Sequence, residues 1–145
     1  MVTAYLRSHF RSAKISRRLS NALVNSGISE LVYTKALSFV EDNRNSDVEL
    51  FKSMYSSKLP RDCFINLYDA DLKSGIAAHR DHVSFCTVVV CLEGNSEGNL
   101  VITQETGELV TVSLFSNEML VFARIDHYVN VVVRSEKRIT LNAFF

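Results

Sequence analysis

Tryptophan is absent from this chain of 145 residues, and only one proline and five glycines occur in it. With so few chain-breaking residues and 47% hydrophobic residues, the composition excludes a disordered protein and predicts a globular one with a single core. A net charge of zero indicates no particular partner. No apolar run approaches the length of a membrane span and no signal peptide is recognisable, so we expect no membrane association.

Cysteines are also scarce, and the three present, Cys63, Cys86 and Cys91, form no Cys-x-x-Cys pair. An odd number without a paired spacing is typical of reduced, mostly buried thiols rather than of a disulfide framework. We therefore expect an intracellular protein, cytoplasmic or nuclear.

Acidic residues are missing from the first 29 positions, because the first of them is Glu30. We interpret the basic residues of this stretch as the solvated face of a surface helix. Two alternatives stay open, a basic arm that contacts nucleic-acid phosphates and a transit peptide. The basic residues are Arg7, Arg11, Lys14, Arg17 and Arg18.

The spacing of hydrophobic residues changes at Pro60. Before it, apolar residues recur every three or four positions, which predicts helices. Ser46 and Glu49 have the spacing of a capping box, and Gly27 stands where a helix would end. The expected helices cover 2–13, 19–27, 31–40 and 48–55.

After Pro60 the hydrophobic period is two, and Val, Ile, Thr, Phe and Tyr dominate. No helical pattern interrupts these segments, so we expect antiparallel sheets folded as a sandwich, jelly roll or barrel. The fold class is α+β in one domain, 1–145, with helical support in 1–58 and about eight strands in 62–145. The expected strands cover 62–69, 76–80, 83–92, 98–105, 108–114, 118–123, 126–133 and 137–145.

His79, Arg80 and Asp81 spell a tripeptide found in protein-kinase catalytic loops. The kinase interpretation is excluded, because the chain continues His-Val-Ser-Phe-Cys and has no glycine-rich phosphate loop. On a strand, His79 and Asp81 would face the same side. With His127, which lies in another β segment, they make the two-histidine, one-carboxylate set of non-haem Fe(II) oxygenases. The plainer alternative is a group of polar residues at a strand end.

The other two of the four histidines receive no metal role. On an unbroken strand His82 would point away from His79. His9 falls on the apolar stripe of the first expected helix, where we expect it at the edge of the core.

Residues 62–145 resemble the 2-oxoglutarate- and Fe(II)-dependent dioxygenases, whose fold is a double-stranded β-helix, or jelly roll. The likeness begins with "FINLYDADLKSGIAAHRD", similar to the family's stretch from Asn-x-Tyr to His-x-Asp. It continues with "EGNLVITQETGELVTVSLFSNEMLVF", similar to the middle hairpins. It closes with "DHYVNVVVRSEKRITLNAFF", where a basic residue and then Ser or Thr follow the second histidine.

The resemblance implies a role for each matching residue. The metal ligands would be His79, Asp81 and His127, and the metal Fe(II). Arg138 and Thr140 would hold the distal carboxylate of 2-oxoglutarate, and Asn66 and Tyr68 would contact this co-substrate as in the nucleic-acid-repair branch. Lys137 stays an alternative to Arg138, because it lies ten residues after His127, where many members carry the basic residue.

The activity implied is hydroxylation of a C–H bond of a protein side chain or a nucleic-acid base, with dioxygen consumed and 2-oxoglutarate decarboxylated to succinate. Two alternatives remain, a non-catalytic jelly-roll binding module and a cupin-like metalloenzyme that does not use 2-oxoglutarate. The loop over 69–77 is expected to border the mouth of the site and to influence specificity. The substrate and the oligomeric state are not predicted.

Overall fold

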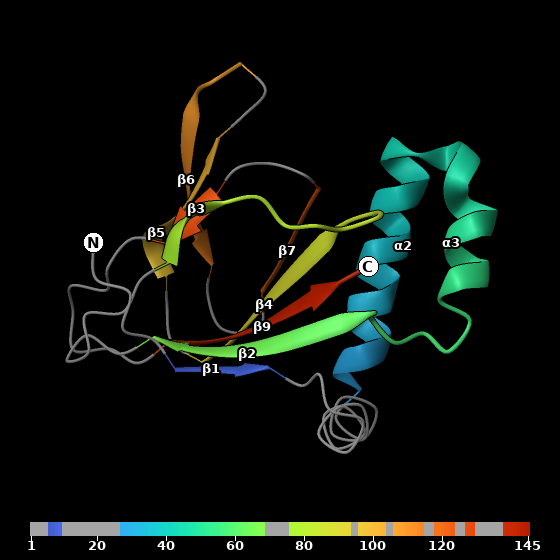
Figure 1. Ribbon diagram of the computed structural model, residues 1–145, viewed down its shortest axis with the longest axis horizontal. Coiled ribbons are helices and arrows are strands. Elements are labelled where there is room, and N and C mark those ends of the chain that lie inside the picture. The colour runs from blue at the N-terminus through green and yellow to red at the C-terminus, as the bar shows by residue number, and fades with distance from the viewer. Residues whose placement is uncertain are drawn as a thin grey trace.

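The architecture combines helices with antiparallel sheets, as the sequence predicts (Figure 1). Helices α2 and α3 lie together on one side of the molecule, and strands β3, β5 and β6 lie on the other. The computed structural model describes residues 6–9, 27–68, 76–93, 96–103, 106–114, 118–123, 127–129 and 138–145.

Two sheets make up the β part of the described residues. The five-stranded sheet contains, in spatial order, β1 (Leu6–His9), β2 (Asp62–Tyr68), β9 (Arg138–Phe144), β4 (Thr87–Glu93) and β7 (Met119–Phe122). The four-stranded sheet contains β3 (Ile76–His79), β8 (His127–Val129), β5 (Ser96–Thr103) and β6 (Leu109–Leu114). The chain passes repeatedly from one sheet to the other, which is the order expected of a jelly roll. The number of strands in the roll stays a prediction, because several of them border residues outside the described ranges.

The helical layer consists of α2 (Ile28–Asn43), the short 3₁₀ turn η1 (Asn45–Asp47) and α3 (Val48–Met54). Helix α2 buries residues spaced three and four apart, so its apolar stripe packs on β4 and β7. This confirms the helix expected over 31–40 and lengthens it at both ends. The stripe consists of Val32, Tyr33, Ala36 and Val40.

Phe51 of α3 occupies the centre of an aromatic cluster in the core. Its side chain is fully buried, and its ring centroid lies 5.0 to 5.8 Å from four other aromatic rings. Aromatic rings at these separations attract one another beyond the area they bury. The four partners are Tyr33, Tyr55, Phe85 and Phe145, so the cluster joins both helices to the β part.

The helix expected over 2–13 is wrong at Leu6–His9, which forms β1 and pairs antiparallel with β2. A strand edge offers a row of unpaired backbone groups, and pairing with it outweighs a weak local preference for helix. His9 is therefore opposite Phe64 in a sheet and not on a helical stripe. The helix expected over 19–27 falls outside the described residues except for Gly27, which precedes α2 with φ of 75°.

The expected capping box of Ser46 and Glu49 is also wrong. Ser46 lies inside η1, and α3 begins at Val48 with Asp47 as its N-cap residue. The Asp47 carboxylate contacts the Arg44 guanidinium instead, at 2.7 and 2.9 Å. In the described part of the chain, no side-chain cap hydrogen bond forms at this helix start.

The five-stranded sheet has two different faces. Alternate residues of β4 and β9 join the apolar core with the helices, among them Val88, Val90, Leu141 and Ala143. The residues between them lie on the opposite face, which combines the polar Thr87, Thr140 and Asn142 with buried apolar side chains such as Val89. Because the buried hydroxyls of Thr87 and Thr140 require hydrogen-bond partners, this face is a candidate functional surface.

The three cysteines are buried and none of them forms a disulfide, as predicted. Burial raises the pKa of the Cys86 thiol to about 12, although the nearby Arg44 opposes the shift. Cys86 therefore stays protonated at neutral pH and behaves as a small core residue. Among the described helices, none has the length and apolar character needed to cross a membrane.

Candidate active site

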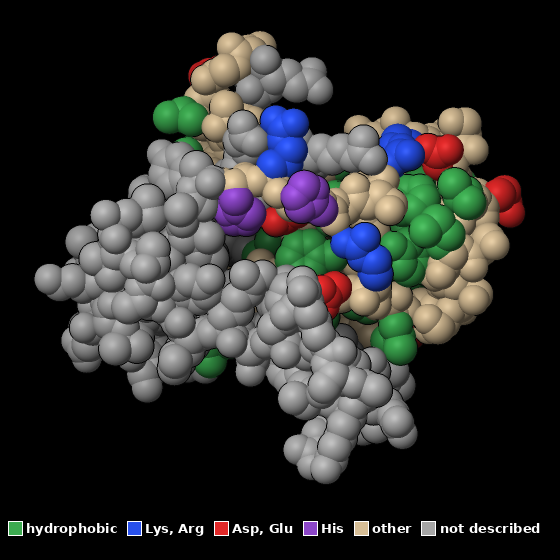
Figure 2. Space-filling view, in the orientation of Figure 1, with side chains coloured by type: hydrophobic (Ala, Val, Ile, Leu, Met, Phe, Trp, Pro, Cys, Tyr) green, Lys and Arg blue, Asp and Glu red, His purple; other side chains and the backbone are tan. Residues whose placement is uncertain are grey.

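His79 and Asp81, the two residues of the His-x-Asp motif, are in contact. His79 ends β3, and the chain then leaves the four-stranded sheet for β4 through residues 80–86. The distance between His79 Nε2 and Asp81 Oδ1 is 3.2 Å. The His79 side chain is 39% exposed and that of Asp81 only 11%, so the carboxylate lies deeper than the imidazole. Figure 2 shows histidine side chains on this face of the molecule, beside acidic and basic ones.

The separation of these two atoms fits joint coordination of one cation. Nitrogen and oxygen ligands lie about 2.0–2.2 Å from a transition-metal ion, so two of them at a right angle are roughly 3 Å apart. The observed 3.2 Å agrees with that geometry. An imidazole nitrogen and a carboxylate oxygen form a donor set that suits Fe(II).

The position of His127 lies next to that of His79. His127 begins β8, and the register of β8 on β3 places it directly opposite His79. Directly opposed residues of antiparallel strands have Cα atoms about 4.5–5.5 Å apart. The backbone thus brings all three expected ligand positions to one place. Among the described side chains there is no group of three metal-ligating residues, and the convergence of the three side chains on one ion stays a prediction.

The reason for excluding His82 from the ligand set is wrong in its detail. His82 is not on an unbroken strand, because β3 ends at His79 and β4 begins only at Thr87. Its side chain is exposed, and its backbone carbonyl accepts a hydrogen bond from Arg61 Nη2 at 2.6 Å. His82 is therefore a near neighbour of the proposed ligands and a suitable control for them.

The four expected co-substrate residues occupy two adjacent cross-strand pairs. The register of β2 on β9 places Tyr68 opposite Arg138 and Asn66 opposite Thr140. Because each strand contributes positions two apart, all four positions share one face of the sheet. That face is the one turned away from the helices, and Thr87 of β4 lies on it as well.

Thr140 is 1% exposed and accepts a hydrogen bond from Asn142 Nδ2 at 3.2 Å. A hydroxyl that accepts one hydrogen bond still has its own proton to donate, as binding of a carboxylate requires. Asn142 was not among the expected residues, although its place two residues after Thr140 puts it on the same face. Lys137 and most of the 69–77 loop fall outside the described residues.

Thr87 is a second residue that sequence reasoning did not single out. Its hydroxyl Oγ1 donates a hydrogen bond to Asp81 Oδ2 at 2.8 Å, and its side chain is 1% exposed. In the sequence Thr87 opens the run Thr-Val-Val-Val, where threonine is an ordinary β-branched strand residue. Only its spacing of six residues from Asp81 could have suggested the contact.

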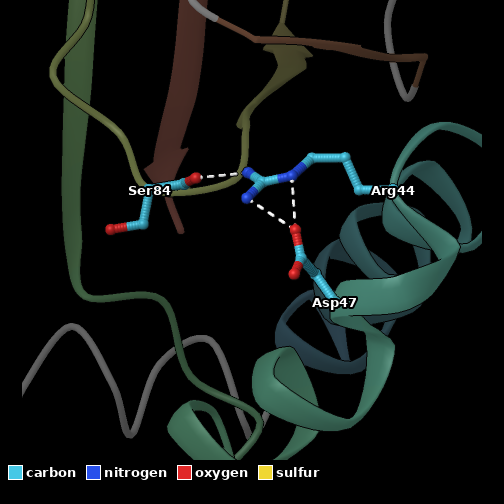
Figure 3. Close-up of polar contacts among 3 residues, drawn as sticks. All are labelled: Arg44, Asp47 and Ser84. Atoms are coloured by element: carbon cyan, nitrogen blue, oxygen red, sulfur yellow. Dashed lines mark hydrogen bonds and ion pairs between the residues drawn. The ribbon is translucent and has the colours of Figure 1, made fainter.

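Two arginines hold the backbone of the segment that contains Asp81. Arg61 donates to the carbonyl of His82, and Arg44 Nη1 donates to the carbonyl of Ser84 at 2.6 Å. Figure 3 shows the Arg44 guanidinium between the Asp47 carboxylate and the Ser84 carbonyl. The guanidinium also lies 4.9 Å from the centroid of the Phe85 ring. Arg44 and Ser84 are 40 residues apart, so no local pattern could predict their contact.

We expect Arg44→Ala to lower the free energy of unfolding by about 1–3 kcal/mol, because it removes charge-assisted hydrogen bonds to Asp47 and Ser84. Arg44→Lys should recover less than half of that loss, since one ammonium cannot reproduce the planar fork. Urea unfolding measures both variants against Lys35→Ala, which alters an exposed residue of α2. A lysine variant as stable as the parent protein would show that the fork is unimportant.

Searches against family models and against curated proteins found no match to the chain. Solved structures do match it. A prolyl-4-hydroxylase from Pseudomonas putida has a TM-score of 0.52 at 14% identity, over 97% of this chain and 67% of that one. An oxidoreductase of the 2OG-Fe(II) oxygenase family from Burkholderia pseudomallei has a TM-score of 0.52 at 21% identity, over 66% and 49%. AviO1 from Streptomyces viridochromogenes Tue57 has a TM-score of 0.50 at 16% identity, over 64% and 53%.

These similarities confirm, at the level of the fold, the likeness to 2-oxoglutarate- and Fe(II)-dependent oxygenases seen in the sequence. The match to the prolyl hydroxylase extends over nearly the whole chain, helices included. Against the other two structures the chain spans about half of their length, 49% and 53%.

Proposed function

We propose that this chain is a jelly-roll oxygenase that uses Fe(II) and 2-oxoglutarate to hydroxylate a C–H bond, with 1–145 as one domain. The observation that carries the proposal is the contact of His79 with Asp81, together with the cross-strand pairing of His79 and His127. The fold shared with oxygenases supports it.

Each protein group has a distinct task in this proposal. His79, Asp81 and His127 would hold Fe(II), and Arg138 with Thr140 would hold the distal carboxylate of 2-oxoglutarate through a guanidinium fork and a hydroxyl. Asn66 and Tyr68 would complete the co-substrate contacts. When bound there, the iron and co-substrate would supply an oxidation in which substrate C–H, dioxygen and 2-oxoglutarate give substrate C–OH, succinate and carbon dioxide.

The surroundings of the site contain apolar side chains that exclude water. Ile102 of β5, paired with His127, is buried, as are Val89 and Phe122 on the site face of the five-stranded sheet. A dry wall strengthens the electrostatic contacts made inside it and protects reactive species from side reactions. The proposed chemistry requires such an environment.

The rim of the proposed site carries exposed polar side chains. Arg80 and His82 are exposed and follow His79 closely in the chain, and the exposed Arg61 contacts the carbonyl of His82. A polar rim suits a peptide or nucleic-acid segment better than an apolar small molecule. Binding to single-stranded DNA and RNA, measured at low and physiological salt, separates the two, because phosphate contacts make affinity fall steeply with salt.

The test of the function is an anaerobic titration of the metal-free protein with Fe(II), followed by 2-oxoglutarate, with succinate formation measured after air is admitted. We expect Fe(II) to bind, 2-oxoglutarate to change the visible absorption of the bound iron, and succinate to form. Iron binding without any response to 2-oxoglutarate would favour a cupin-like metalloenzyme. No metal binding at all would favour a non-catalytic module.

Arg138→Ala should abolish succinate formation and raise the Kd for 2-oxoglutarate by about 10²–10⁴-fold, because a charge-assisted bidentate contact contributes roughly 3–5 kcal/mol. Fe(II) affinity should stay nearly unchanged, since Arg138 is on β9 and not among the proposed ligands. Lys137→Ala is the matched control, and we expect it to remain active. If Lys137→Ala lost co-substrate binding while Arg138→Ala kept it, Lys137 would be the anchor.

A further inference from the structure

The two carboxylate oxygens of Asp81 have different partners. Oδ1 faces His79 Nε2 at 3.2 Å, and Oδ2 accepts the hydrogen bond from Thr87 Oγ1 at 2.8 Å. A carboxylate can bind a metal through one oxygen or through both, and the choice changes how many coordination positions remain open. The Thr87 hydroxyl thus hydrogen-bonds to Oδ2, the carboxylate oxygen that does not face His79.

Thr87 is held in place by its strand pairings and its burial, so its hydroxyl cannot move with the Asp81 carboxylate when that side chain rotates. It lies on β4, which pairs with β7 and β9 on its two sides, opposite Phe122 and Phe144. A buried β-branched side chain in the middle of a sheet has few rotamers available. Its hydroxyl therefore has a fixed position from which to hold Oδ2.

The backbone between the two residues is fixed as well. The amide of Phe85 donates to the carbonyl of Phe145, and the amide of Phe145 donates to the carbonyl of Cys86, both at 3.0 Å. Arg61 and Arg44 hold the carbonyls of His82 and Ser84, as described above. The backbone that follows Asp81 is anchored by these contacts, and the pairing of His79 with His127 places the chain before it. The main remaining freedom of Asp81 is rotation of its side chain, which the Thr87 hydrogen bond restricts.

We propose that Thr87 is a positioning residue that makes Asp81 a one-oxygen ligand through Oδ1. The inference rests on the proposed function, because it requires a metal ion between His79 and Asp81. With Oδ2 engaged by a hydroxyl, the carboxylate occupies a single coordination position, and those that the co-substrate and dioxygen need stay open. Without the hydroxyl, Oδ2 loses this hydrogen bond, and the restriction that keeps it turned away from the ion is weakened.

The test uses Co(II) alone, added to the metal-free full chain and followed by its visible absorption. Thr87→Val removes the hydroxyl with little change of shape, and Thr87→Ser keeps the hydroxyl and loses the methyl group. We expect Thr87→Val to weaken Co(II) binding by about 10- to 100-fold, as loss of an orienting partner of a metal ligand does. Its Co(II) absorption should also change in intensity, because the coordination number changes. Thr87→Ser should bind within about threefold of the parent protein and keep its spectrum.

Unfolding of the metal-free variants in urea separates positioning from folding. If Thr87→Val does not fold, Thr87→Ala takes its place, because it removes the hydroxyl without adding an apolar methyl group against Asp81. We expect the same loss of Co(II) affinity in this variant. A serine variant that behaves like the valine variant, or a valine variant with unchanged affinity and spectrum, would overturn the proposal. A parent protein that binds no Co(II), or a His79→Ala variant that binds it equally well, would instead contradict the metal site on which the inference rests.

Discussion

We expect His79→Ala and Asp81→Ala each to abolish succinate formation and to reduce Fe(II) affinity by more than the roughly 100-fold that loss of an outer partner costs. Each variant removes one of the two groups whose Nε2 and Oδ1 atoms lie 3.2 Å apart, and an ion held by only two of the three proposed ligands would exchange rapidly with water. Anaerobic Fe(II) titration gives the affinity, and succinate formation gives the activity.

The matched control for these variants is His82→Ala. His82 is an exposed histidine in the same segment, and the contact that fixes it uses its backbone carbonyl, which the substitution leaves in place. We expect it to retain metal affinity and activity. If His82→Ala lost iron while His79→Ala kept it, the ligand set would contain His82 instead of His79.

Phe51→Ala should lower the free energy of unfolding by about 3–5 kcal/mol, the largest stability effect that we expect in this chain. The ring is fully buried and contacts four other aromatic rings, so its removal leaves a cavity that rigid neighbours cannot fill. Urea unfolding of the metal-free protein provides the measurement.

Leu50→Ala serves as the control, because Leu50 is the preceding residue on α3 and is 53% exposed. Its substitution should change stability by less than about 0.5 kcal/mol. Equal losses for the two variants would show that the helix as a whole, rather than the buried ring, limits stability.

The features that the sequence predicts are those that depend on neighbours along the chain. Alternation of apolar residues after Pro60 predicts antiparallel strands. The spacing of two residues predicts that His79 and Asp81 lie together. The two side chains are in contact, but the strand ends at His79, so the contact forms where the chain leaves β3 and not along one face of a strand. Helix α2 follows from its apolar stripe. In each case the information is contained within a few consecutive residues.

The features that were missed depend on contacts between distant segments. β1 forms because β2 offers a pairing edge, which the local pattern of Leu6–His9 does not reveal. The capping box does not form because Ser46 lies within the η1 turn and α3 begins at Val48, one residue after Asp47, whose carboxylate contacts Arg44. Thr87 was overlooked because a threonine in a valine-rich strand has an ordinary structural explanation, and only the fold brings its hydroxyl to Asp81.

Strand β9 combines two kinds of residue in strict alternation. Leu141 and Ala143 belong to the core with the helices, and Thr140 and Asn142 lie on the face of the proposed site. Because neighbouring residues of the strand point to opposite faces, a substitution at one position changes either the core face or the site face and leaves the other unchanged. A deletion or insertion of a single residue would exchange the two sets, placing Thr140 in the core and Leu141 in the site. Both faces therefore require the number of residues in β9 to stay the same. We expect related proteins with different substrates to differ at the site-facing positions of β9, such as Thr140 and Asn142, and to keep the length of the strand.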